Sequence, residues 1–235
     1  MKFFIDAIGQ LLTSLPLGGL PELAKKALAY FQKSKNVQSE KPKSVKSEST
    51  NEKIEALFKR KNYAYEPEQT LIVVRTVGSD QQFDDFILAY CADGWRKFRC
   101  TAEPGRLIDG YLQGLLREGY YRNLYKIHNR PFSKNGLPYL RMQRPITTDN
   151  KQTGKPMTER TLQIHGRKAT STTVGTASQS CVVLARPTKG IVEFVQFLID
   201  TLAARKASKY SFFHLAFFLS QNFDCSAIPF AKGEK

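Results

Sequence analysis

The stretch TKGIVEFVQFLIDTLAARK, residues 188–206, decides the fold class of this chain. Its apolar residues recur at the spacing of one helical face, at positions 191, 194, 195, 198, 199 and 202. This spacing predicts an amphipathic helix, with Thr188 as its N-cap. The segment SFFHLAFFL (211–219) follows and is typical of a buried strand.

Strands are predicted on the amino-terminal side of this helix. The β-branched run TLIVVRTV (70–77) indicates a buried strand. Residues 87–91 and 95–100 predict a hairpin around Asp93-Gly94. Further strands are expected at 139–143, 161–165 and 180–184. Because most strands precede a single helix, we predict an α+β fold with a strand-rich body and one late helix, not a doubly wound sheet.

The amino-terminal part of the chain has a different composition from this body. Residues 1–33 have apolar residues at helical spacing, broken at Pro16–Pro21, and predict a helical appendage. Residues 34–50 combine Ser, Lys, Glu and Pro with a single apolar type, which predicts a flexible linker. Residues 51–69 are expected to form a short helix and connector, and 70–235 the main domain.

The appendage has three possible docking surfaces: a membrane surface, a virion or other assembly partner, and the body itself. As a signal peptide it is poor, because Asp6 interrupts the apolar run and only Lys2 precedes it. No run reaches the ~18 apolar residues of a membrane span. We therefore expect a protein made in the cytoplasm that acts at the cell envelope or is carried in a virion.

Charge and composition exclude several classes of protein. The net charge is +15, and residues 1–69 contribute 12 Lys/Arg against 8 Asp/Glu, so most of the excess lies on the body. Such a surface favours anionic partners such as wall polymers, headgroups or nucleic acid. Nucleic acid ranks last because no basic–aromatic motif is present. The chain has no GxGxxG, P-loop or CxxC, so no cofactor and no metal site is expected.

One His and one Cys lie sixteen positions apart, at the end of one predicted strand and the start of the next. These are His165 and Cys181, joined by a loop rich in Thr, Ser and Gly. A nearby His can lower the pKa of a thiol and shuttle protons for a Cys nucleophile. Free Cys is also among the most buried residue types, so the residues alone leave a structural pair open as well.

The same stretch resembles the signature of L,D-transpeptidases of the YkuD type, a His followed by Ser/Thr-x-Gly-Cys. The corresponding residues here are His165 and Ser178-Gln179-Ser180-Cys181. Elements of a small bacterial and phage group of these proteins are similar in order to segments of this chain. They are Thr101-Ala102-Glu103-Pro104-Gly105, Gly119-Tyr120-Tyr121 leading to His128, and Leu162-Gln163-Ile164-His165.

The resemblance implies an L,D-transpeptidase-like body and acyl transfer on peptidoglycan stem peptides. Cys181 is then the nucleophile, His165 the base and acid, and Ser178 a residue that orients the imidazole. Substrate contacts are implied for Glu103, His128, Arg167 and Ser180. Two positions depart from the family: Ser180 replaces the usual Gly, and Gly166 stands where Arg is common. The alternative is therefore an inactive wall-binding or virion module on the same fold.

Overall fold

The computed structural model describes residues 49–76, 82–103, 112–132, 137–166, 180–187, 189–204, 206 and 211–234, with the backbone alone at 129–132. The expectations for the appendage, for residues 34–48 of the linker, and for Thr188, Ser178 and Arg167 lie outside these residues.

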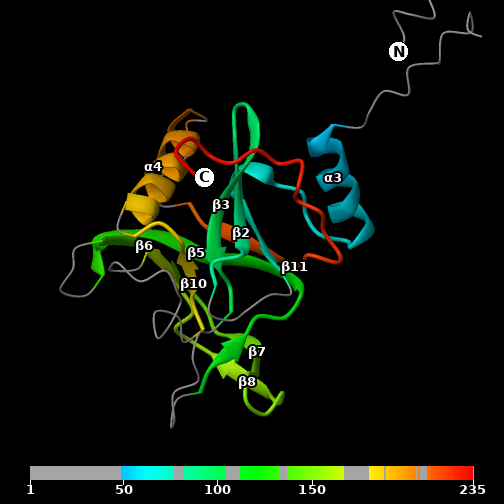
Figure 1. Cartoon of the computed structure of the whole chain (residues 1–235), viewed down its shortest axis with the longest axis vertical. Coiled ribbons are helices and arrows are strands. Elements are labelled where there is room, and N and C mark those ends of the chain that lie inside the picture. The colour runs from blue at the N-terminus through cyan, green and yellow to red at the C-terminus, as the bar shows by residue number, and fades with distance from the viewer. Residues whose placement is uncertain are drawn as a thin grey trace, which may run out of the picture. The chain divides into compact units, whose positions relative to one another are not determined.

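Eight strands of the described chain form a closed barrel (Figure 1). Around the barrel the order is β1-β11-β5-β6-β9-β10-β3-β2, with β1–β11 and β9–β10 parallel. The strands are β1 (Thr70–Arg75), β2 (Asp85–Cys91), β3 (Gly94–Thr101), β5 (Gly119–Phe132), β6 (Leu137–Met142), β9 (Ile164–Gly166), β10 (Val182–Leu184) and β11 (Phe213–Leu219).

A second, antiparallel sheet lies at one end of the barrel, where β7 and β8 are labelled in Figure 1. Its strand order is β4-β7-β8, and it consists of β4 (Gly114–Leu115), β7 (Ile146–Asn150) and β8 (Pro156–Glu159). This small sheet carries part of the candidate site described below.

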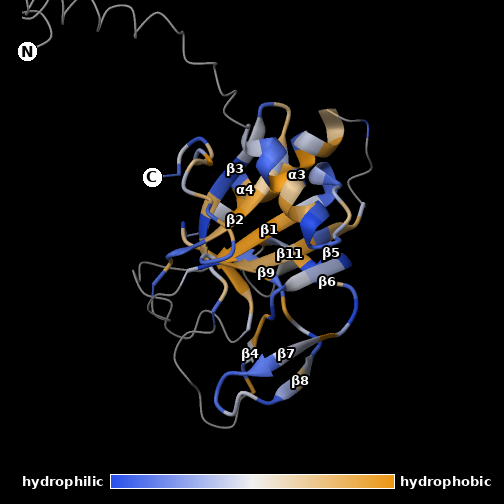
Figure 2. Ribbon diagram, turned by 90° about the vertical axis from the view of Figure 1, so that its right-hand side faces the viewer, coloured by the Kyte–Doolittle hydropathy of each residue, from blue (hydrophilic) through white to orange (hydrophobic). Residues whose placement is uncertain are grey.

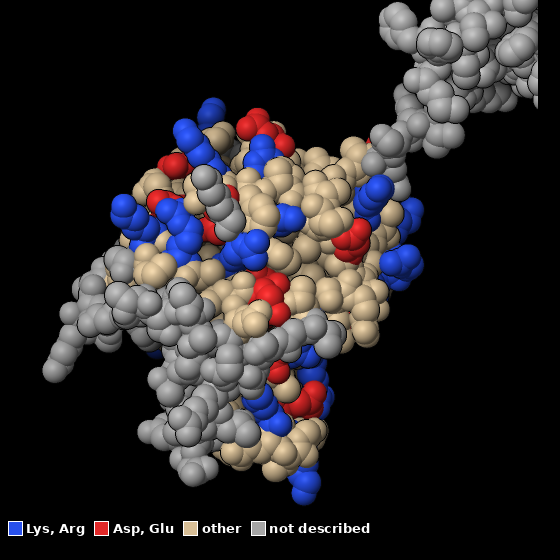
Figure 3. Space-filling view, in the orientation of Figure 1, with Lys and Arg blue, Asp and Glu red and all other residues tan. Residues whose placement is uncertain are grey.

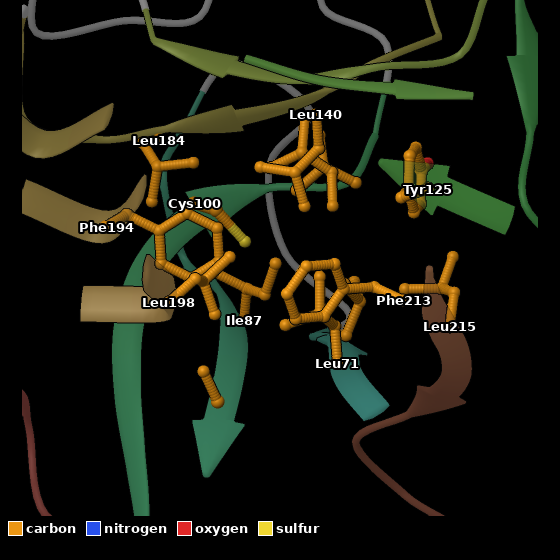
Figure 4. Close-up of a cluster of buried hydrophobic side chains, with 14 of the residues drawn as sticks. Leu71, Ile87, Cys100, Tyr125, Leu140, Leu184, Phe194, Leu198, Phe213 and Leu215 are labelled. Carbon is orange, nitrogen blue, oxygen red and sulfur yellow. The ribbon is translucent and has the colours of Figure 1, made fainter. Parts of the chain in front are cut away.

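Helix α4 (Lys189–Ala204) packs its apolar face against the barrel. Phe194 and Leu198 point toward Ile87, Cys100 and Leu184 in the barrel (Figure 4). The late helix predicted from the sequence is thereby confirmed, and with it the strand-rich α+β architecture. Within the described part, no helix is long and apolar enough to span a membrane.

Helix α3 (Thr50–Arg60) covers the opposite face of the strands from α4. It begins with a capping box between Ser49 and Glu52 and buries Ile54, Leu57 and Phe58. The 3₁₀ turn η2 (Pro67–Gln69) then leads into β1. Hydrophobic residues line the layers between helices and strands (Figure 2).

This two-sided cover explains the continuous apolar run at 70–75. Leu71 and Val73 pack in the core that contains α4, whereas Ile72 and Val74 pack in the core that contains α3. A strand buried on both faces has no reason to alternate apolar and polar residues.

The predicted strands are present with shifted ends, and the hairpin turns at Gly94, whose φ is +96°. The predictions for 161–165 and 180–184 were too long at their amino-terminal ends. At the first, the N–H of Thr161 donates to the side chain of Glu159 (2.8 Å) and not to a strand. At the second, the N–H of Gln163 donates to Cys181 Sγ (3.4 Å) in place of a backbone carbonyl.

Asp85 ties the end of β3 to the edge of β1. One carboxylate oxygen accepts the N–H of Ala102 (2.6 Å) and the other accepts the N–H of Thr76 (2.8 Å). Burial raises the pKa of Asp85 to about 7. As the pH rises, Asp85 loses its proton in the unfolded chain at a lower pH than in the folded chain. Its contribution to the free energy of unfolding is therefore greatest below pH 4 and is lost toward pH 7.

We expect Asp85→Asn to remove this pH dependence. The wild type should lose about 4 kcal/mol of unfolding free energy from this group between pH 4 and pH 7.5, by urea titration. The variant should be less stable at low pH, because one N–H loses its acceptor, and should show a flatter profile. An unchanged slope would show that another group carries the pH dependence.

Candidate active site

The parallel pair β9–β10 places His165 on one strand and Cys181 one residue before the start of the other. Val183 is the register partner of His165, and Cys181 lies two positions before Val183. The N–H of Val182 donates to Gln163 O (2.9 Å), which continues this register to the residue before it. His165 and its partner Val183 share a face of the sheet, whereas Cys181 precedes β10 and its Sγ lies 3.4 Å from the backbone nitrogen of Gln163. Ile164, Val182 and Leu184 point the other way, into the core.

His165 is held in one tautomer by its own backbone. Its Nδ1 lies 2.7 Å from the carbonyl oxygen of Gly166. A carbonyl oxygen only accepts, so Nδ1 carries the proton and the lone pair is on Nε2. Burial lowers the pKa of His165, so the imidazole is neutral at pH 7. The residue therefore has the form that a general base requires.

Cys181 is a protonated thiol at rest. Its Sγ accepts the N–H of Gln163 (3.4 Å) and lies 3.8 Å from the carbonyl oxygen of Thr161. Burial, with a smaller contribution from the Glu159 carboxylate, raises the pKa of Cys181 to about 11. The sequence predicted a His that lowers the pKa of this thiol. The pair instead consists of a neutral thiol and a neutral imidazole.

Cys181 opens into a surface pocket of about 320 Å³. The pocket lies between the entry to β10 and strand β8, and its walls combine polar and apolar side chains. It is lined by Leu112, Met157, Thr158, Glu159, Arg160, Thr161, Ser180 and Cys181. A second surface pocket of about 450 Å³ shares Thr158 with the first and includes Arg117, Tyr121 and Arg144. The two pockets therefore adjoin across β8.

Ser180, which replaces the usual glycine, has a structural partner. Its Oγ accepts the N–H of Gly114 on β4 at 2.7 Å, and the side chain is buried. Ser180 is not among the described residues with positive φ, so its backbone does not require glycine. The hydroxyl binds the small sheet to the start of β10.

Glu103 and His128 lie away from this pocket. Glu103 pairs with Lys151 at 4.0 Å and does not line the pocket. The ring of His128 packs against Tyr139 across β5 and β6, with a centroid separation of 5.0 Å. Of the predicted residues that the structure describes, Cys181 and Ser180 line this pocket, and His165, Glu103 and His128 do not.

Two residues of this site carried no signal in the sequence. Glu159 lies in a short strand without recognisable periodicity, and Gly114 in a two-residue strand. In the described ranges no three His, Cys, Asp or Glu side chains are grouped to hold a metal ion, and all four cysteines are free thiols.

Comparison with known proteins found no matching family model, no matching curated protein and no matching solved structure.

Proposed function

We propose that this protein is a cysteine acyltransferase or peptidase that acts on peptidoglycan stem peptides, with an L,D-transpeptidase-like body. The observation that supports it most is the arrangement of His165 and Cys181. His165 lies on β9 and Cys181 just before its parallel partner β10, and the bond from Nδ1–H to Gly166 O puts the lone pair of the imidazole on Nε2. A base oriented by a second group beside a nucleophile is the arrangement that nucleophilic catalysis requires.

In the first half-reaction the sulfur of Cys181 attacks a peptide carbonyl carbon. His165 Nε2 takes the thiol proton as the S–C bond forms, which avoids a free thiolate whose pKa is about 11. The carbonyl oxygen becomes an oxyanion, and the nearby N–H of Gln163 is a candidate donor to it. The tetrahedral intermediate then expels the leaving amine, which receives the proton from His165, and a thioester remains.

In the second half-reaction an acceptor attacks the thioester carbon. His165, neutral again, removes a proton from the acceptor and returns it to sulfur as the C–S bond breaks. An amine acceptor forms a new amide, which is a cross-link, and water forms a carboxylic acid. Both outcomes restore the Cys181 thiol.

The charge of the body suits an anionic wall. Lys and Arg outnumber acidic side chains on the face shown in Figure 3, around α4 and the β2–β3 hairpin. Electrostatic attraction of exposed charges acts over a Debye length of about 8 Å at physiological ionic strength. We include in the proposal residence at the envelope or in a virion, with residues 1–33 as the segment that docks on a membrane surface or assembly partner.

A second candidate is an inactive wall-binding or virion module. It is favoured by the raised pKa of Cys181 and by Ser180, whose side chain fills the position beside the nucleophile. This candidate binds wall material through the same surface and has no turnover.

The test is incubation with purified stem-peptide fragments, with products identified by mass spectrometry. We expect cross-linked or shortened peptides from the wild type and none from Cys181→Ala. Sacculus pull-down of the same two proteins should give equal binding. Binding without products in either protein would support the inactive module, and products from Cys181→Ala would exclude Cys181 as the nucleophile.

A further inference from the structure

Glu159 is a buried carboxylate in the wall of the Cys181 pocket. Its exposed fraction is 6%, although it lines the pocket. The N–H groups of Arg160 and Thr161 and the hydroxyl of Thr161 all donate to Oε1, at 2.8–2.9 Å. These three bonds fix the side chain in place at the end of β8.

This carboxylate has no cationic partner within the part of the chain that the structure describes. No Lys, Arg or His nitrogen of those residues lies within ion-pair distance of it. Arg160 also lines the pocket, but it is exposed, so water screens its charge. Burying a carboxylate without a counter-ion is costly, and such groups are found mostly where a ligand or reaction uses them.

Two further buried polar groups near Glu159 have no hydrogen-bond partner among the described residues. They are the hydroxyls of Thr148 and Tyr125, whose residues are both 0% exposed. A methyl group on Gly114 would lie 2.6 Å from Thr148 Oγ1 and 3.3 Å from Glu159 Oε2, so both oxygens pack against this glycine. Tyr125 is within electrostatic range of both Cys181 and Glu159. Behind the pocket wall, two unsatisfied hydroxyls thus lie near the negative charge of Glu159, which itself lines the pocket.

We propose that the pocket beside Cys181 binds an alkylammonium group of the substrate, with Glu159 as its counter-ion. The inference rests on the proposed function and deepens it, since it names the chemical group that the peptide presents next to the sulfur. A primary ammonium supplies three donors and one positive charge, which are what an unpaired carboxylate and a nearby hydroxyl oxygen require.

Binding of such a group has a consequence for the nucleophile. The negative charge of Glu159 contributes to the raised pKa of Cys181. An ammonium in the pocket neutralises this charge and makes loss of the thiol proton easier. The thiol is therefore more readily deprotonated when substrate is present than in the empty enzyme.

Charge-selective thiol reagents test the pocket without any turnover. The 2-aminoethyl and 2-sulfonatoethyl methanethiosulfonates differ in charge and transfer their thioalkyl group to a thiolate with release of methanesulfinate. Peptide mapping of the full chain gives the rate at each cysteine. At Cys181 we expect the ratio of cationic to anionic rates to exceed that at Cys91 by at least about tenfold, despite the net charge of +15.

Glu159→Gln is the matched variant. Gln keeps the oxygen that the three donors use and removes the negative charge. We expect the Cys181 ratio to fall to within about threefold of the Cys91 ratio in this variant. Arg160→Gln, the control, should leave the ratio unchanged or raise it.

A wild-type ratio at Cys181 equal to that at Cys91 would overturn the inference, as would a preference that persists in Glu159→Gln or a thiol that no reagent reaches. A cation preference in a protein without turnover would leave the ammonium pocket standing and reject the proposed catalysis. Turnover with equal ratios at Cys181 and Cys91 would support the proposed catalysis and reject the ammonium pocket.

Discussion

Replacement of His165 by Ala is expected to slow acylation of Cys181 by a factor between about 10² and 10⁴ at pH 7. The thiol has a pKa of about 11 and is almost fully protonated at that pH, so it depends on a base to attack. In the proposed mechanism His165 is that base, with its lone pair on Nε2. The rate of acylation is measured with a stem-peptide substrate in reactions that are quenched at a series of times.

The pH profile separates a base from a merely structural residue. In the wild type, kcat/KM should increase as the pH is raised toward 6.5, because the imidazole loses its proton in this range. Through neutral pH it should then stay level. In His165→Ala the rate should rise about tenfold per pH unit toward the pKa of the thiol, because only the thiolate reacts. His128→Ala is the control and should stay within about twofold of the wild type. A level profile in His165→Ala would assign His165 a structural role.

Gly166→Ala is expected to destabilise the fold by about 3 kcal/mol or more. A methyl group at this position would lie 2.4 Å from Ile191 Cγ2 and 2.9 Å from Ile191 Cβ, inside any real contact distance. Helix α4 would have to move away from β9. This close packing explains why the position requires glycine.

A double-mutant cycle with Ile191→Ala tests the cause. Ile191→Ala alone should cost about 2–5 kcal/mol through the cavity it leaves. The double variant should cost at least about 1 kcal/mol less than the sum of the two, because the methyl group fills part of that cavity. Urea titration gives each free energy of unfolding. Strict additivity would mean that Gly166 is required for a reason other than the contact with Ile191.

The long apolar and alternating segments were predictable from the sequence, and the short ones were not. Helix α4 has the helical period of one buried face, strands β1 and β11 have continuous apolar runs because both their faces are buried, and a turn signal marks the β2–β3 hairpin. Strand β5 was missed although it spans 14 residues, because its charged and aromatic residues follow no simple alternation. Strands β4, β7 and β8 were missed because strands of two to five residues are too short to show a detectable periodicity.

The candidate site was predictable only in its reactive pair. The spacing of His165 and Cys181 indicated neighbouring strands, and β9 and β10 do pair in parallel, while the proximity of the two side chains stays a prediction. The protonation states were not predictable, because burial raises the pKa of the thiol and no local sequence pattern reports burial. Glu159 reaches the site through the small sheet, where the N–H of Gly114 donates to the hydroxyl of Ser180 just before β10.

The most direct test of the account is the site of covalent attachment during turnover. A reaction with stem-peptide substrate is stopped with acid within its first turnovers and digested, and the acylated peptide is identified by mass spectrometry. We predict one acyl group, on Cys181, at full occupancy in the wild type. In His165→Ala we predict that this acyl group forms at about 1% or less of the wild-type rate. An acyl group on Cys91, Cys100 or Cys225, or turnover with no acyl-enzyme on Cys181, would contradict it.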